Sequence, residues 1–393
     1  MAAPLHVLIY EPYPWGQVSG NLQTLTFMLK HVSREAVRFT LMVPFDGGFL
    51  DLAKEYEVET VEFPPPDRVN QYGGAALRGG VVGRLRTVRE LIAYNFQIRR
   101  YLKDNAVDVV YANSVRTAVT VGLGARLAGV PMHLYIKGEL DNPVIDHVAL
   151  PMATRITFFS EQNRDDRYPM LIRMLSDRID ILPPGLDPDV LMAAEHASDI
   201  DDLGVRGEKI AYVGQLFPAK GVHFLLEAFG KIAPRFPEAQ LVLIGDPMID
   251  AYRDYPDQLK QRAEELGVSD RVHFPGWRRD VLQLLRSMDI LVHPTLAEGF
   301  GRAVLEAMAM CLPVVASKVG GLRSSVIEGE TGFLVEVGDV DAIADRMVAL
   351  LSDPSLRERM GAAGRTRVHG NYLVADKMDE LTEIWQRTSG NAR

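Results

Sequence analysis

The sequence lacks most of what marks a secreted, membrane-spanning or nucleic-acid-binding protein. Its 393 residues include one cysteine, Cys311, so no disulfide can form within the chain and a reducing compartment is expected. No apolar stretch reaches the roughly 20 residues that a membrane-spanning helix needs. The formal net charge is -9 at pH 7. Nucleic acid is therefore not expected as a partner, because binding phosphates needs a broad basic surface.

The amino-terminal segment also lacks the features of a signal peptide. No lysine or arginine precedes its apolar run, and that run ends at residue 10, so it is predicted to be a first strand. We expect a cytoplasmic protein, or one bound peripherally to the inner face of a membrane. Hydrophobic residues make up 47% and charged residues 24% of the chain, which is typical of a globular protein.

Short apolar runs alternate with longer amphipathic segments along the chain. Continuous apolar runs are typical of strands buried on both faces of a parallel sheet. Strand–helix alternation on this scale predicts a doubly wound α/β fold. The expected strands are 6–10, 37–43, 107–112, 132–136, 156–159, 210–213, 240–244, 289–293 and 312–316, and the expected helices include 21–33, 115–128, 222–233 and 302–310.

The alternation is interrupted once, after residues 179–187, by a polar stretch that includes 195–202. We therefore predict two Rossmann-like domains, 1–185 and 186–371, each too small to need subdivision. Residues 372–393 are predicted to form a last helix, which crosses back to the first domain or packs elsewhere. The two sheets are expected to face each other across a cleft and to bind ligands at the carboxyl ends of their strands.

The segment 291–310 carries the clearest chemical signal. A strand is followed by a loop that contains Glu298, Gly299 and Gly301, and a helix is expected to begin near Arg302. The glycines let the backbone approach a ligand closely, and the helix N-terminus presents N–H groups and partial positive charge. These features together predict a diphosphate site.

Glu306 lies in a helix that is otherwise apolar nearly all round. An ionised carboxylate buried there would cost several kcal/mol without partners, and the hydroxyl groups of a ligand could supply them. The alternative is that Glu306 faces solvent on a half-exposed helix. The apolar neighbours are Ala303, Val304, Leu305, Ala307, Met308, Ala309 and Met310.

Taken together, these motifs resemble the family 4 glycosyltransferases of the GT-B fold. Glu298-Gly-Phe-Gly is followed by Glu306, then by Pro313-Val-Val-Ala-Ser and by Gly320-Gly321. The resemblance is dense in the second half of the chain and loose in the first. Three further parts of the chain resemble the family. Residues 212–221 are similar to its phosphate-binding strand and loop, and residues 242–246 and 274–276 to the strand ends near the nucleotide base. Residues 331–339 are similar to its closing strand.

The resemblance implies a retaining hexosyltransferase (EC 2.4) of polysaccharide or glycolipid biosynthesis. Such an enzyme moves a sugar from a nucleotide-diphosphate donor, such as a UDP- or GDP-sugar, to a glycan or lipid-linked acceptor, without a metal or other cofactor. Front-face attack is implied, in which the leaving phosphate helps to deprotonate the acceptor hydroxyl. The alternatives are a nucleotide-sugar epimerase of the same fold and an inactive sugar-nucleotide binding protein.

Residue roles follow from the resemblance position by position. Glu298 is expected to hold donor-sugar hydroxyls and Lys220 to neutralise the diphosphate, although a lysine at a helix start is more often simply solvated. Glu306 is expected to bind the ribose hydroxyls. The further donor-binding residues implied are Gly299, Phe300, Gly301, Gly214, Gln215, Gly245, Gly276 and Arg302.

The first domain contributes fewer candidates. Ser19 and Gly20 lie in a glycine-containing loop that resembles the one opposite the donor, or is an ordinary strand-to-helix loop. Asn113 follows another strand and could face the same ligand site. Lys137 stands where the family often has a histidine; it could bind an anionic sugar or acceptor, or merely pair with Glu139.

One donor-side position also departs from the family pattern. Gln215 replaces an arginine that is common after the glycine of the phosphate motif. Arg302 could supply the missing charge, or could be an unrelated surface residue.

Residues 77–104 form a basic amphipathic segment. A helix of this kind can lie on an anionic membrane, which would suit lipid-linked acceptors, or can be a solvated helix that packs on the first domain. Its basic residues are Arg78, Arg84, Arg86, Arg89, Arg99, Arg100 and Lys103, and the interleaved apolar residues are Leu85, Val88, Leu91, Ile92, Phe96 and Tyr101.

Overall fold

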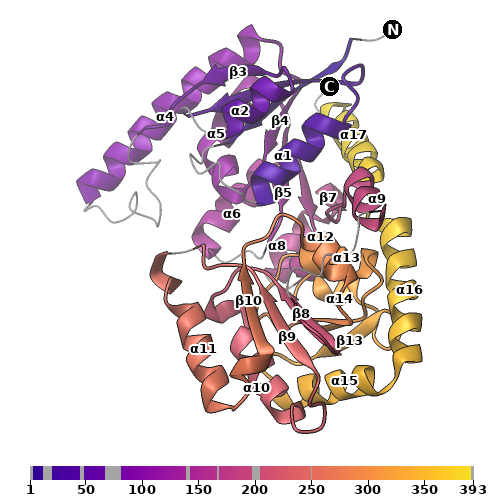
Figure 1. Cartoon of the computed structure of the whole chain (residues 1–393). Coiled ribbons are helices and arrows are strands. Elements are labelled where there is room, and N and C mark those ends of the chain that lie inside the picture. Colours follow the sequence, from indigo (N-terminus) through magenta and orange to yellow (C-terminus); the bar gives the residue numbers. More distant parts are fainter. Residues whose placement is uncertain are drawn as a thin grey trace. The chain divides into compact units, whose positions relative to one another are not determined.

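The computed structural model describes residues 3–11, 20–44, 48–66, 81–138, 142–165, 168–196, 204–248 and 250–390. The chain divides into two compact units. Unit 1 comprises Met1–Phe159, Asn163–Pro183 and Val374–Arg393, and unit 2 comprises Ser160–Gln162 and Pro184–Leu373. Figure 1 labels the elements of both units. No helix among the described residues is long and apolar enough to span a bilayer.

Unit 1 is built on a sheet of seven parallel strands in the order β3-β2-β1-β4-β5-β6-β7. The order reverses between β1 and β4, where Val7 pairs with Phe39 on one side and with Val109 on the other. This reversal is the point at which doubly wound sheets bind ligands. The strands are β1 (Leu5–Tyr10), β2 (Val37–Val43), β3 (Glu59–Glu62), β4 (Val109–Ala112), β5 (Met132–Ile136), β6 (Arg155–Phe158) and β7 (Ile179–Ile181).

Helices cover both faces of this sheet and enclose two apolar cores. The last helix, α17, belongs to this unit, and its fully buried Trp385 donates a hydrogen bond to His133 Nδ1 (3.0 Å). Ser114 caps the N-terminus of α5 by accepting from the Thr117 N–H. The helices are α1 (Gly20–His31), α2 (Gly48–Glu55), α4 (Val81–Asp104), α5 (Val115–Ala128), α6 (Pro143–Met152), α8 (Pro169–Met174) and α17 (Val374–Gly390), and α7 (Glu161–Asp165) begins in unit 2.

Unit 2 repeats the plan with six parallel strands in the order β10-β9-β8-β11-β12-β13, reversing between β8 and β11. One core cluster lies between the sheet and α10, α11 and α15. The strands are β8 (Lys209–Val213), β9 (Gln240–Ile244), β10 (Val272–Gly276), β11 (Ile290–His293), β12 (Val314–Ser317) and β13 (Gly332–Val335). The helices are α9 (Pro188–His196), α10 (Val222–Ile232), α11 (Tyr255–Glu265), α12 (Val281–Arg286), α13 (Arg302–Ala309), α14 (Leu322–Ser325), α15 (Val340–Ser352) and α16 (Pro354–Asn371).

The prediction of two doubly wound parallel sheets is confirmed. Every predicted apolar run coincides with a strand, and the predicted helices coincide with α1, α5, α10 and α13. The predicted apolar runs do not include β3, β7, β10 or β13. Of these, β3 has the sequence Glu-Thr-Val-Glu and its residues are mostly exposed. As an edge strand, β3 is not buried on both faces and so needs no continuous apolar run.

Candidate functional site

In unit 2, two loops meet at the carboxyl ends of β8 and β11, where the strand order reverses. The first loop follows β8 and ends in a short turn at Pro218–Lys220, and the second follows β11. The Leu296 N–H donates to the Ala219 carbonyl oxygen (2.9 Å), which joins the two loops. A Cβ on Gly221 would lie 1.9 Å from the Pro294 carbonyl oxygen, so only glycine permits this approach. The junction holds the loop side chains in fixed positions.

Glu298 occupies the centre of this junction. Its Oε2 accepts hydrogen bonds from Lys220 Nζ (2.7 Å) and His293 Nε2 (3.2 Å). Its Oε1 accepts from the Gly299 N–H (3.1 Å). The structure therefore brings together Glu298, predicted to hold the donor sugar, and Lys220, predicted to neutralise the diphosphate.

These contacts fix the charge of Glu298. Its side chain is 18% exposed. Burial on its own would raise the pKa of the carboxyl, but the hydrogen bond from His293 and the positive charge of Lys220 outweigh it and lower the pKa to about 2. The carboxylate is therefore ionised across the neutral pH range and can accept hydrogen bonds from hydroxyl groups but cannot donate them.

His293 is a member of this cluster that the sequence analysis did not select. It is the last residue of β11, is buried, and stacks on Tyr212 with the ring centroids 6.0 Å apart. Its Nε2 must carry a proton to bond a carboxylate, and its Nδ1 has no hydrogen-bond partner among the residues that the structure describes. A polar residue at the end of an otherwise apolar strand was the available signal.

The helix α13 begins directly after this loop. Gly301 precedes it with φ +84°, a left-handed conformation that favours glycine. Arg302 and Glu306, one turn apart, form an ion pair with Nε and Oε1 separated by 2.7 Å. The helix is not buried all round, because Arg302, Ala303 and Glu306 lie on a partly exposed face. The burial argument for Glu306 therefore missed that Arg302 already supplies its partner, at a spacing readable from the sequence.

Most of the other predicted donor-side residues can reach a ligand only through their backbone. Phe300 is 3% exposed and packs edge-on against the Tyr372 ring, so only its backbone can reach a ligand. Gly214 and Gly245 directly follow β8 and β9, and Gly276 is the last residue of β10. A Cβ on Gly245 would lie 1.9 Å from the Gly214 carbonyl oxygen, which explains why residue 245 is glycine. The exposed Gln215 accepts at its backbone oxygen from the Tyr212 hydroxyl.

In unit 1, the candidates cluster at the equivalent reversal point. Asn113 follows β4 and donates from Nδ2 to Oε2 of the buried Glu11 (2.9 Å), the residue after β1. Lys137, after β5, donates to Asn113 Oδ1. Ser19 and Glu139 lie outside the described residues, and Gly20 is the first residue of α1. Lys137 thus has Asn113 as a partner, which sequence reasoning did not foresee.

The described part of the chain contains no group of three or more His, Cys, Asp or Glu residues that could hold a metal ion. Metal independence itself stays a prediction.

The sequence is similar to a family model and to curated glycosyltransferases. Residues 199–367 match the family model of the glycosyl transferases group 1. The D-inositol 3-phosphate glycosyltransferase of Corynebacterium glutamicum (strain R) is 35% identical over 194 residues, 47% of this chain and 46% of the relative. The capsular polysaccharide biosynthesis glycosyltransferase CapM of Staphylococcus aureus is 34% identical over 176 residues, 45% of each chain. The chain thus spans about half the length of the curated relatives it matches.

Solved structures resemble nearly the whole chain. Anabaena Alr3699/HepE in complex with UDP matches with a TM-score of 0.77 at 20% identity, covering 98% of this chain and 100% of that one. A glycosyltransferase from Rickettsia africae ESF-5 matches with a TM-score of 0.80 at 17% identity, covering 99% of both chains. At these identities the likeness concerns the fold, and it confirms the predicted GT-B architecture.

Proposed function

We propose, from the match of residues 199–367 to the glycosyl transferases group 1 family, that the chain is a retaining, metal-independent hexosyltransferase. Its donor is a nucleotide-diphosphate sugar and its acceptor a glycan or lipid-linked hydroxyl. In the transfer, the acceptor oxygen bonds to the anomeric carbon as the bond from that carbon to the diphosphate oxygen breaks. The acceptor proton passes to the leaving phosphate, so no protein base is assigned.

The observation that carries this proposal is the Lys220–Glu298 pair at the reversal point of unit 2. Lys220 would stabilise negative charge as it develops on the departing diphosphate, and positioned charges of this kind are a large part of catalysis. Glu298, held ionised, would accept hydrogen bonds from donor-sugar hydroxyls. The N–H groups of Gly299 to Gly301 and the N-terminus of α13 would bind the phosphates.

Glu306 and Arg302 would complete the donor site. In the structure the two side chains form an ion pair with each other. A bound nucleotide can redirect both side chains, with Glu306 accepting from the ribose hydroxyls and Arg302 approaching the phosphates in place of the arginine that Gln215 replaces. The partly exposed face that they share on α13 gives a ligand access to both.

A screen of purified protein against nucleotide sugars tests the proposal. UDP-sugars come first, because the Anabaena HepE structure holds UDP, and GDP-sugars come second. Release of nucleoside diphosphate, with and without a chelator, is expected for one donor class and at equal rates under both conditions. Loss of activity on chelation would contradict metal independence. Sugar interconversion without nucleotide release would indicate an epimerase, and binding without turnover an inactive protein.

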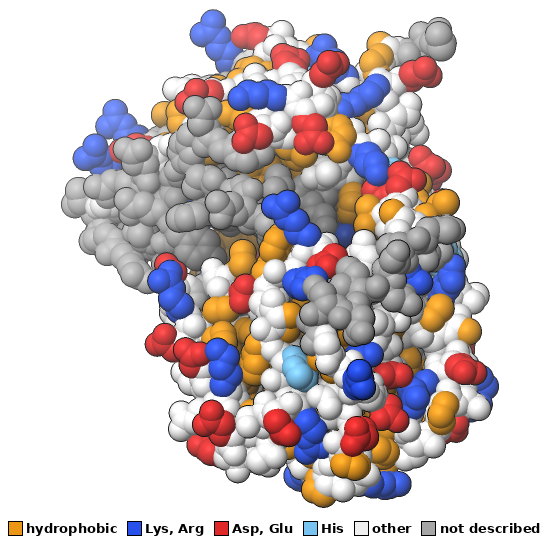
Figure 2. All heavy atoms as spheres, viewed as in Figure 1, with side chains coloured by type: hydrophobic (Ala, Val, Ile, Leu, Met, Phe, Trp, Pro, Cys, Tyr) orange, Lys and Arg blue, Asp and Glu red, His pale blue; other side chains and the backbone are white. Residues whose placement is uncertain are grey.

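A second proposal concerns the membrane. Four apolar side chains on α4 are exposed at helical spacing, from Leu85 (65%) through Val88 and Ile92 to Phe96 (55%). The opposite face of the helix is buried through Tyr94, Ile98 and Leu102. Basic side chains project from this helix at the upper left of Figure 2; the exposed ones include Arg86, Arg89, Arg100 and Lys103.

We propose that the exposed apolar side chains of α4 and the basic residues beside them contact an anionic membrane surface, as an amphipathic basic helix can. This contact would bring the enzyme to lipid-linked acceptors. Co-sedimentation with anionic vesicles at low salt is expected, and binding to neutral vesicles is expected to be weaker. Phe96→Asp should release the protein, whereas Leu127→Asp, at a leucine on α5 that is 42% exposed, should not. Failure to co-sediment with anionic vesicles would contradict the membrane contact without affecting the transferase proposal.

A further inference from the structure

His293 is held in place on one side and contacts Glu298 on the other. It ends β11 and is 2% exposed, and a ring packed at this density turns only by displacing its neighbours. The ring lies nearly parallel to that of Tyr212 on the adjacent strand β8, at an interplanar angle of 9°. The Tyr212 hydroxyl in turn donates to the Gln215 backbone oxygen (2.9 Å). The orientation of His293 is therefore fixed from the neighbouring strand.

The proton of His293 is confined to one nitrogen. Nε2 lies 3.2 Å from Glu298 Oε2, and an ionised carboxylate only accepts, so Nε2 carries a proton. Nδ1 is buried and has no hydrogen-bond partner among the described residues. A second N–H at Nδ1 would be a buried donor without an acceptor, which costs free energy. The favoured form is therefore the neutral ring, which donates from Nε2.

The two oxygens of Glu298 are used unequally. Oε2 accepts from His293 and from Lys220 Nζ (2.7 Å), whereas Oε1 accepts from the Gly299 N–H (3.1 Å). Each carboxylate oxygen has about two acceptor sites, so Oε1 keeps capacity for a ligand. Lys220 has a flexible stem and is attracted to an incoming diphosphate. The fixed ring of His293 is the contact that stays with the carboxylate when a donor binds.

We propose that His293 is a positioning residue, which holds Glu298 by Oε2 and so presents Oε1 to one hydroxyl group of the donor sugar. This role rests on the proposed transferase function, whereas the link between His293 and Glu298 does not. His293 does not contact the donor, because its ring is buried. A fixed acceptor favours sugars that place a hydroxyl group against it. Loss of His293 should therefore impair recognition of the sugar and leave recognition of the nucleotide intact.

Steady-state kinetics with the donor found in the screen tests this role. His293→Phe keeps a ring on Tyr212 but removes the donor at Nε2, and kcat/KM should fall about tenfold or more. The calorimetric affinity for the nucleoside diphosphate should change by less than about twofold, since its contacts remain. His293→Gln, whose amide can donate from a similar place, should retain kcat/KM to within about threefold of wild type.

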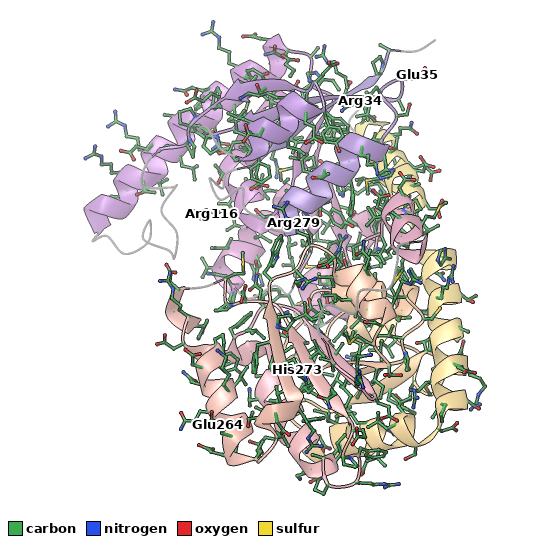
Figure 3. All side chains as sticks on the ribbon, viewed as in Figure 1. Arg34, Glu35, Arg116, Glu264, His273 and Arg279 are labelled. Atoms are coloured by element: carbon green, nitrogen blue, oxygen red, sulfur yellow. The ribbon has the colours of Figure 1, made fainter. Side chains whose placement is uncertain are left out.

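A matched control is available on β10. His273, labelled in Figure 3, is a partly buried histidine whose Nε2 lies 2.9 Å from Gln240 Oε1. His273→Phe makes the same substitution away from Glu298 and should match wild type in kcat/KM.

A double-mutant cycle separates positioning from a purely structural role. In a Glu298→Ala background, His293→Phe should lower kcat/KM by less than about twofold further, because the carboxylate that it positions is already absent. Equal losses in both backgrounds would overturn the proposal. So would an unchanged kcat/KM in His293→Phe, or a nucleotide affinity that falls as much as kcat/KM does.

Two other outcomes are covered by the same variants. If His293→Phe does not fold, His293→Asn takes its place: its shorter amide does not reach Glu298 and must lose the activity that His293→Gln retains. If wild type turns over no donor, the transferase proposal fails, and with it the role toward the sugar. The cycle is then measured by urea unfolding, where non-additive losses support the link between His293 and Glu298 and additive losses overturn it.

Discussion

The two reversal points of the molecule use the same pair of residue types, a lysine and a glutamate, in different ways. In unit 2, Lys220 Nζ lies 2.7 Å from Glu298 Oε2, in a direct ion pair. In unit 1, Asn113 stands between Lys137 and Glu11. The two clusters occupy equivalent places in two similar sheets, so the difference lies in the contact and not in the fold.

The electrostatic consequences are opposite. The direct pair, together with His293, offsets burial and lowers the pKa of Glu298 to about 2, so that its charge is fixed before any ligand arrives. The bridged lysine is dominated by burial, which lowers the pKa of Lys137 to about 7. A direct ion pair therefore suits a site that must hold a charge ready for a reaction.

The largest expected effect is on the rate of sugar transfer when the direct ion pair of unit 2 is removed. Lys220→Met removes the positive group proposed to stabilise the leaving diphosphate, and the transfer rate should fall by about 100- to 1,000-fold. Nucleoside diphosphate release with the donor found in the screen measures it. The matched control is Lys231→Met, an exposed lysine of the same unit that pairs with Asp341, which should retain full activity. A fall of less than about threefold for Lys220→Met would contradict its role.

A smaller effect is expected on stability at Glu298. Glu298→Gln keeps the shape but removes the charge that Lys220 and His293 contact, and should reduce the free energy of unfolding at pH 7 by about 1–3 kcal/mol. Urea unfolding measures this change. Glu264→Gln, at an exposed position on α11 labelled in Figure 3, should change it little.

The pH dependence of the same variant sharpens the prediction. The pKa of Glu298 is about 2 in the folded protein and about 4.3 when unfolded. Because the folded value is the lower one, its stabilisation is complete above about pH 4.3 and is lost as the pH falls toward 2. The Glu298→Gln variant should not lose this part of its stability as the pH falls. An equal loss in wild type and variant between pH 5 and 3 would contradict the assigned pKa.

A further effect of pH on stability is expected at Lys137, in the same direction as that at Glu298. Its pKa is about 7 in the folded protein and about 10.4 when unfolded, so the unfolded chain holds the proton more tightly between these values. The stability that this residue contributes therefore falls as the pH drops from about 10 to 7. Groups that contact it or act on it are Glu11, Asn113 and Tyr135.

Urea unfolding at pH 9.5 and 7.5 tests this expectation. Wild type should lose more stability over this interval than Lys137→Met does, whereas Lys231→Met should behave like wild type. The same slope in wild type and Lys137→Met would contradict a lowered pKa, and would weaken the contrast between the two reversal points.

Both sheets could be predicted from the sequence because each buried strand is a continuous apolar run, as in β1 and β11. Sequence reasoning also selected Glu298 and Lys220 individually. It could not pair them, because residues 78 positions apart meet only through strand order, and the same holds for Glu11 and Asn113, 102 positions apart. The Arg302–Glu306 pair was within reach of sequence reasoning, since residues four apart on a helix are neighbours.

The central claim is that unit 2 binds a nucleotide-diphosphate donor, with Glu306 on its ribose. Calorimetric titration of UDP and of GDP into wild type, Glu306→Ala and the surface control Glu264→Ala tests it most directly. The account predicts that one nucleotide binds wild type and Glu264→Ala equally and binds Glu306→Ala about tenfold or more weakly, since hydrogen bonds to a charged group are lost. Equal affinity in all three proteins would contradict the ribose contact, and no binding of either nucleotide to wild type would contradict the donor site.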